Sequence, residues 1–242
     1  MKAKIAFLTF ATTFSSIAAA GELTLGELNT GAIIEDTDIL LTPNFEISKI
    51  GLSDKLELGT FVLGNATGFI NLGATYGLIQ NDDSMLTVTA WGAYELAWED
   101  EDTGESGGNV PWLWSQVDYT MPMGENWLTI NAGTGGSIED GGFVFGGSNL
   151  SLYYLMLNGD KGWQFEIWTD PYGLSQGSAA LDVTGVGGQW IMAMETLRFG
   201  LGLDVMGTQG FIDNTPFGSI IEESDYSLPV IVAPSVYLAF RI

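Results

Sequence analysis

The chain of 242 residues contains no cysteine and no histidine. Without cysteine it can form no disulfide, offers no thiolate to a metal and has no cysteine to carry a lipid anchor. Histidine is the usual base of serine hydrolases and a common ligand of zinc, copper and haem, so its absence disfavours those sites. We therefore expect no cofactor and no enzymatic activity.

Basic residues are scarce, with 7 Lys and Arg against 30 Asp and Glu and a formal net charge of −23. Lys2 and Lys4 precede an apolar stretch over residues 5–17 and the small residues 18–20, a pattern typical of a secretory signal peptide cleaved near Ala20. The acidic balance repels nucleic acid and attracts cations. No run of 18 apolar residues follows the signal, which argues against a membrane-spanning helix.

Hydrophobic residues make up 46% of the chain, but they are often interrupted at every second position. This two-residue period is clearest over residues 197–207 and 228–242 and is typical of β-strands. It predicts about twelve strands, with ten as the alternative, in a single β domain over residues 21–242. A soluble β-sandwich would alternate similarly. The predicted strands span residues 23–34, 38–50, 56–63, 67–80, 85–97, 110–121, 127–134, 143–157, 163–170, 179–194, 197–207 and 228–242.

The predicted connections differ in length at the two ends of the strands. At the end that holds the C-terminus they are short, over residues 51–55, 81–84, 122–126, 158–162 and 195–196. At the other end they span residues 35–37, 64–66, 98–109, 135–142, 171–178 and 208–227. All the basic residues beyond the signal lie in or beside a short connection or at the C-terminus: Lys49, Lys55, Lys161, Arg198 and Arg241.

Residues 49–60 read KIGLSDKLELGT. This segment resembles a hairpin of uncharacterised Gram-negative outer-membrane β-barrel proteins, in which a Gly-Leu-Ser/Thr-Asp turn leads into an apolar strand. The C-terminal segment, with Phe240 near its end, is similar to the terminal signal strand of those proteins. The resemblance implies an all-β fold, a single antiparallel transmembrane β-barrel in the bacterial outer membrane. Its implied partners are lipid, lipopolysaccharide and, through the last strand, the barrel assembly machinery.

Charged residues in the middle of the strands are the first candidates for function. We expect them to line the lumen: Glu46, Glu57, Glu95, Asp118, Glu166, Asp182, Arg198 and Asp204. Carboxylates around a wet pore favour cations, so we predict a passive, cation-favouring channel for small cationic or neutral solutes. Alternatively, these groups bond to one another or to Lys49 and Arg198 inside a filled lumen, making a closed structural or surface-interaction barrel. A third class is a histidine-free enzyme acting on envelope lipid.

The connection over residues 98–109 carries five carboxylates, Glu99, Asp100, Glu101, Asp102 and Glu105. It does not match the spacing of an EF-hand loop. It is either a solvated acidic loop, a calcium or magnesium site, or a divalent bridge to lipopolysaccharide phosphates.

Many aromatic residues fall near predicted strand ends, where an interfacial girdle explains them. This set contains Trp98, Trp112, Trp114, Trp127, Tyr119, Tyr153 and Tyr154. Trp91 and Trp168 are instead predicted to point inward, where a sugar or an aromatic solute could stack on them.

Overall fold

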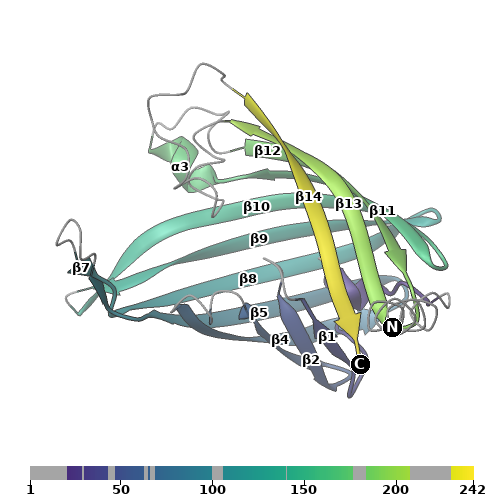
Figure 1. Cartoon of the computed structure of the whole chain (residues 1–242), viewed down its shortest axis with the longest axis horizontal. Helices are drawn as coiled ribbons and strands as arrows, with labels where there is room; N and C mark the ends of the chain where they lie inside the picture. Colours follow the sequence, from purple (N-terminus) through teal and green to yellow (C-terminus); the bar gives the residue numbers. More distant parts are fainter. Residues whose placement is uncertain are drawn as a thin grey trace, which may run out of the picture.

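Twelve antiparallel strands close into one β-barrel in the computed structural model (Figure 1). The structure describes residues 21–28, 30–42, 47–62, 65, 69–99, 106–139, 141–176, 184–207 and 230–242. The ring contains β1 (Ile39–Leu41), β2 (Ser48–Ser53), β3 (Leu56–Thr60), β4 (Phe69–Asn81), β5 (Ser84–Glu95), β8 (Val110–Met123), β9 (Asn126–Glu139), β10 (Gly142–Asn158), β11 (Lys161–Thr169), β12 (Thr184–Ala193), β13 (Leu197–Gly207) and β14 (Val230–Arg241). The predicted all-β class and the count of twelve are confirmed.

Four short elements of the described residues lie outside the ring of strands. β6 (Trp98–Glu99) and β7 (Ser106–Gly107) pair as a separate ribbon. The helix α3 (Pro171–Ser175) follows β11, and Asp170 caps it by accepting a hydrogen bond from the backbone N–H of Tyr172. The 3₁₀ turn η1 (Leu25–Glu27) precedes the first strand.

The barrel closes where the first strand meets the last. Leu40 of β1 pairs with Arg241 of β14, and Leu41 pairs with Phe240. Reciprocal backbone hydrogen bonds between Ile39 and Ile242, at 3.1 and 2.9 Å, extend this ladder by one residue. Because β1 has only three residues, the closing seam is short and lies at the end of the barrel that holds the C-terminus.

Tight turns gather at that same end, which we call the turn end; the opposite end is the loop end. The turn positions are residues 54–55, 82–83, 124–125, 159–160 and 194–196, which confirms the five predicted short connections. Gly124 and Gly159 have φ of +69° and +61°, a conformation that glycine adopts without strain in two-residue hairpins. In the β4–β5 turn, the side chain of Asn81 accepts hydrogen bonds from the N–H groups of Asp83 and Ser84.

The twelve strands are not the twelve that were predicted. The described residues of the range 23–34 form no strand, so that prediction was wrong. The predicted strand 38–50 instead provides both β1 and β2, which pair with each other. As a result, residues 35–37 lie at the turn end, where Thr37 N–H bonds to Gly51 O, and not in an outer connection.

The predicted outer loop over residues 135–142 was also wrong. β9 and β10 continue as a paired hairpin to Glu139 and Gly142, so only residues 140–141 separate them. The register shift between Phe145 and Gly147 places a bulge in this hairpin. β8 to β10 are the longest strands of the ring, while β1 to β3 have three to six residues each.

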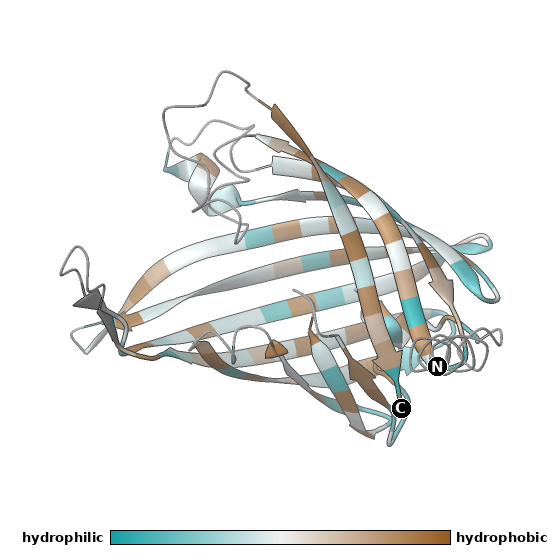
Figure 2. Ribbon diagram, viewed as in Figure 1, coloured by the Kyte–Doolittle hydropathy of each residue, from teal (hydrophilic) through white to brown (hydrophobic). Residues whose placement is uncertain are grey.

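The wall of the barrel has two chemically different faces, and Figure 2 shows apolar and polar bands alternating along the strands. On β11, Trp163, Phe165 and Ile167 point outward and are exposed, whereas Gln164 is buried on the inner face. On β13, Leu201 and Leu203 are exposed while Arg198 is buried. Among the described residues, no helix has the length and apolar character to cross a membrane.

Candidate solute site in the barrel lumen

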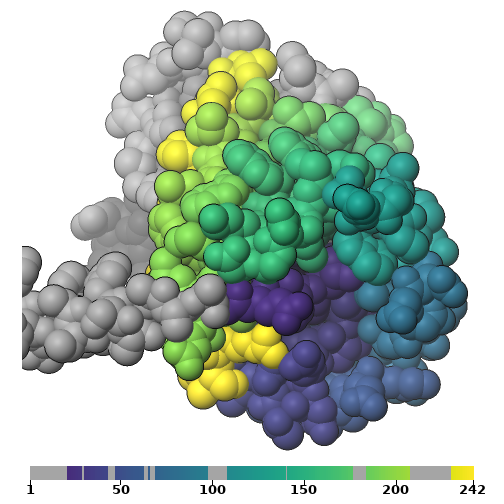
Figure 3. Space-filling model, turned by 90° about the vertical axis from the view of Figure 1, so that its right-hand side faces the viewer, coloured from purple at the N-terminus to yellow at the C-terminus, as the bar shows by residue number. Residues whose placement is uncertain are grey.

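Residues 21–28 and 30–34 lie inside the turn end of the ring, and residues 35–38 lead from them to β1. We call residues 21–38 the inner segment. Figure 3 looks onto that end, and the purple N-terminal residues fill its centre between strands from both halves of the chain. Leu23, Leu28 and Ile34 are buried. They join Leu155 and Ile191 of the wall in the hydrophobic core.

Side chains of the barrel wall form hydrogen bonds with backbone groups of the inner segment. Thr120 Oγ1 accepts from Gly31 N–H at 2.7 Å, and Gln80 accepts from Ile33 N–H while donating to Gly31 O at 2.7 Å. Glu57 Oε2 accepts from Ile34 N–H at 3.2 Å. These partners come from β3, β4 and β8, so the segment is held from several sides instead of by a strand ladder.

A buried ion cluster fixes the same segment to β13 and β14. Arg198 donates from Nε at 3.0 Å and from Nη2 at 2.8 Å to the carboxylate of Glu27. Arg241 donates to Glu27 Oε1 at 3.2 Å and also pairs with Glu35 and Asp38. Glu27 was not predicted as a site residue, and it is the anion that both arginines share.

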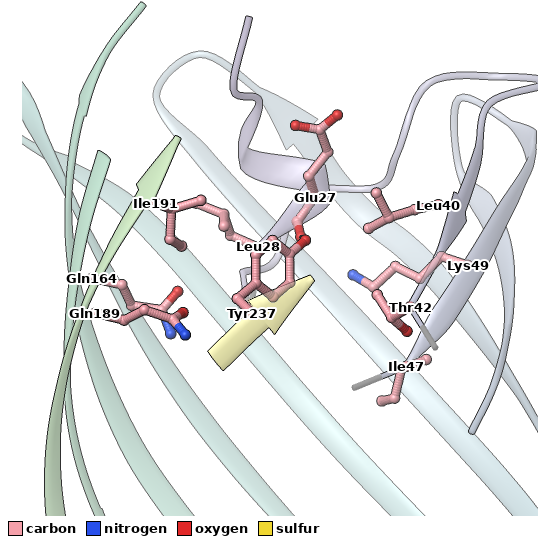
Figure 4. Close-up of a pocket in the computed structure, with 10 residues that line it drawn as sticks. All are labelled: Glu27, Leu28, Leu40, Thr42, Ile47, Lys49, Gln164, Gln189, Ile191 and Tyr237. Carbon is pink, nitrogen blue, oxygen red and sulfur yellow. The ribbon is translucent and has the colours of Figure 1, made fainter. Parts of the chain in front are cut away.

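Little space is left between the inner segment and the wall. The cavity in Figure 4 has a volume of about 30 Å³, which suits a single water molecule. Its lining includes Glu27 and Leu28 of the segment and Gln164 and Ile191 of the wall. Tyr237 donates to the backbone oxygen of Glu27 at 3.1 Å across this region. The inner segment therefore fills most of the lumen at this level.

A polar cavity of about 270 Å³ adjoins the inner segment. Apart from Ile47, Gly59 and Trp91, its lining is polar or charged: Thr30, Lys49, Glu57, Thr75, Thr89, Gln116, Asp118, Asn131, Asn149 and Tyr153. Lys49 Nζ lies 3.6 Å from Glu57 Oε1 and donates to Gly26 O. One lysine and two carboxylates leave this cavity with a formal charge of −1 when all three are ionised.

Asp118 ends a chain of hydrogen bonds across three strands. Ser151 donates to Asn149, Asn149 donates to Asn131 at 2.9 Å, and Asn131 donates to Asp118. Gln116 Nε2 donates to both carboxylate oxygens at 3.1 Å. The carboxylate of Asp118 is thus buried with amide donors around it, and these donors are not the partners that the closed-barrel alternative named. The contact of Glu57 with Lys49 is of the kind that this alternative predicted.

The predicted lumen residues fall into separate groups. Glu57 and Asp118 line the polar cavity, while Glu166 and Asp204 line a second polar pocket of about 80 Å³ with Gln164, Gln189 and Ser235. Glu95 lies at the loop end of β5, away from both pockets. Arg198 points inward, but it is engaged with Glu27 at the turn end. Glu46 and Asp182 lie outside the described residues.

A fourth cavity, of about 380 Å³, is apolar and aromatic. It adjoins the polar cavity, since Ile47, Trp91 and Gln116 line both. Among the described residues, no charged side chain lines it, and the side-chain amides in its lining are those of Asn71 and Gln116. The remaining lining residues are Phe61, Phe69, Ala93, Trp112, Leu113, Trp114, Gly135, Gly136 and Gly146.

Two tryptophans of this cavity, Trp91 and Trp114, belong to one row of residues across the sheet. In this row Gly73, Trp91, Trp114 and Gly135 stand directly opposite one another on β4, β5, β8 and β9. A Cβ on Gly73 would lie closer than 3.0 Å to three ring atoms of Trp91, so the indole covers that glycine with its face. Trp114 covers Gly133 in the same way, with ring atoms at 2.8 to 3.0 Å, and also reaches Gly135. Both indoles therefore lie flat against the wall.

Several aromatic predictions need correction. Trp91 points inward as predicted, and Trp168 lies over Gly185 of the adjoining strand. Trp112 and Trp114, assigned to an interfacial girdle, line the apolar cavity instead, and Tyr153 is buried beside the polar one. The sequence already indicated an inward direction, because Trp112 and Trp114 are six and four positions from Asp118 on one strand and therefore lie on the same face.

Most of the predicted acidic loop, Asp100 to Asp102 and Glu105, lies outside the described residues, as does the side chain of Glu99. Among the residues that the structure does describe, no group of three carboxylates is placed to hold a metal ion. No protein family, curated protein or solved structure matches this chain. The fold and the lumen define its class as a closed twelve-stranded antiparallel β-barrel with an inner segment at the turn end. Its lumen holds an apolar, tryptophan-lined cavity beside a polar one.

Proposed function

We propose that residues 21–242 form a bacterial outer-membrane barrel that passively admits small solutes to its lumen from the loop end. The observation that carries this proposal is the belt of exposed apolar side chains on the outer face. Leu72 is 58% exposed, Leu203 58% and Val232 61%, and they lie on strands from both halves of the chain. A face of this kind is costly in water and is the expected lipid contact of a membrane barrel.

The inner segment supports controlled passage. It occupies the turn end, held by the Glu27 ion cluster, so solute crosses that end only when the segment shifts. In this arrangement the barrel would lie with its turn end toward the periplasm, and lipopolysaccharide and lipid would be its partners at the outer face. The assembly machinery would act on β14, the last strand.

Cations are the favoured charged solutes in this proposal. Glu57, Asp118, Glu166 and Asp204 line the polar cavities, and Lys49 is the one basic residue in the part of their lining that the structure describes. Such a lumen lowers the energy of a cation relative to an anion. The test is the conductance of folded mature protein in a planar bilayer under a potassium chloride gradient, where a cation-selective reversal potential supports the proposal.

A closed structural or surface-interaction barrel is the second candidate. The near-complete filling around Glu27 and Leu28 favours it, and absence of conductance from folded protein would select it. We propose no catalytic role for the chain. An assay of lipid hydrolysis with and without calcium tests the remaining possibility of a histidine-free lipid enzyme, and a change in thermal stability on adding calcium would indicate a metal site.

A further inference from the structure

The geometry points to the apolar cavity as a binding site for an uncharged, planar aromatic molecule. The site deepens the proposed solute entry by naming a solute class, but binding does not depend on passage through the barrel. Its volume of about 380 Å³ falls within the roughly 300–1,000 Å³ of small-molecule sites.

The shape of the walls selects a flat ring. Trp91 and Trp114 stand opposite each other on β5 and β8, and each indole lies over a glycine of the neighbouring strand, Gly73 on β4 or Gly133 on β9. Because the indoles lie against the wall, they present their faces to the cavity and leave its centre open. An aromatic ring stacks on such faces in an offset arrangement, which a flexible acyl chain cannot reproduce.

The polar groups that line the cavity disfavour a charged solute. Asn71 is already occupied: it donates to the backbone oxygens of Phe61 and Phe69 and accepts from Phe61 N–H. The Nε2 of Gln116 donates to Asp118. Among the described residues, no hydrogen bond involves the Oε1 of Gln116. A charged solute would lose its hydration without a partner of opposite charge. A neutral ring with a single hydroxyl would place that donor toward Gln116, at the border with the polar cavity.

The test uses the folded barrel in phosphatidylcholine nanodiscs and titrates 2-naphthol by isothermal calorimetry, with empty nanodiscs as the blank. We expect saturation near one molecule per barrel. Trp91→Ala and Trp114→Ala should each weaken binding by about tenfold, since each removes a stacking surface and buried apolar area. Trp163→Ala, which removes an outward-facing tryptophan, should leave affinity unchanged.

A variant that fills the cavity with a larger side chain provides a second test if the tryptophan variants do not fold. Ala93 lines the cavity, and Ala90 is exposed on the opposite face of the same strand. Ala93→Phe should abolish binding, and Ala90→Phe should preserve it. 1-Octanol, which has a similar polar group but no ring, should bind at least about tenfold more weakly than 2-naphthol.

Uptake equal to that of empty nanodiscs overturns the site, as does unchanged affinity in Ala93→Phe. Octanol binding as tightly as naphthol overturns the preference for a ring. If a barrel without conductance binds naphthol saturably, the site is supported and solute passage is contradicted. The two proposals can therefore be distinguished by experiment.

Discussion

Arg198 and Glu27 form a two-pronged ion pair across 171 positions of sequence, with donor–acceptor distances of 3.0 and 2.8 Å. Both side chains are almost fully buried, at 1% and 3% exposure. Arg241 approaches the same carboxylate and also pairs with Glu35 and Asp38, so Glu27 is the anion that both arginines share at the turn end. The position of the inner segment therefore depends strongly on the charge of Glu27.

Glu27→Gln should destabilise the folded barrel and loosen the inner segment. Removing one partner of a buried pair typically costs about 3–5 kcal/mol, because the remaining charge stays buried without compensation. Chemical denaturation measures the free energy of unfolding, and amide hydrogen exchange over residues 21–38 measures the local effect.

The matched control is Glu35→Gln, which removes another carboxylate bound to Arg241. Glu35 is 69% exposed, so its loss should cost no more than about 1 kcal/mol. Equal losses in the two variants would show that the Glu27 cluster has no special role in holding the segment.

Gly185→Ala should destabilise the barrel, because a Cβ there would lie 2.5 Å from two indole atoms of Trp168. Displacing the ring from the wall costs about 1–3 kcal/mol, as other overpacking substitutions do. Gly92→Ala is the control, since nothing lies within 4 Å of a Cβ at that position. Unfolding midpoints should fall for the first variant and stay nearly constant for the second; similar midpoints would refute the close tryptophan–glycine packing.

Glu166→Gln and Asp204→Asn should lower cation preference in the conducting barrel. The two carboxylates share one small polar pocket, and no basic residue is among the described residues that line it. Neutralising both should reduce the cation-to-anion permeability ratio by about twofold or more, read from the reversal potential. Asp82→Asn in the β4–β5 turn serves as the control. An unchanged ratio in the double variant would mean that these acids do not face the conducting path.

Leu203→Arg should weaken the barrel in a bilayer by about 2–4 kcal/mol, because Leu203 lies in the middle of the outer face of β13. Leu52→Arg, beside a tight turn, should cost about 0–1 kcal/mol, since its guanidinium reaches the interface. Unfolding titrations in lipid vesicles compare the two. A negligible cost for Leu203→Arg would indicate that the belt faces water.

Much of the fold could be predicted from the two-residue period. Strands β8, β13 and β14 were placed nearly at their observed bounds, and the tight turns were found from their polar and glycine residues. The strand count agreed only because two errors cancelled, at residues 23–34 and 38–50. Pro43 within the latter was a local sign of interruption, since proline cannot donate to a ladder.

The inner segment could not be predicted from local pattern. Its partners Gln80 and Thr120 are separated from it by 47 and 89 positions, and their inward direction becomes visible only in the closed ring. The apolar cavity was missed for a different reason. Trp114 was judged by its nearness to a strand end, although its parity with Asp118 already placed it inside.

The most direct test of solute entry is single-channel recording from mature protein already shown to be folded, under a potassium chloride gradient. The account predicts discrete current steps with a cation-selective reversal potential, and a larger open fraction in Glu27→Gln, whose inner segment is less firmly held. Silence from both folded proteins would contradict passage through the lumen and favour a closed barrel.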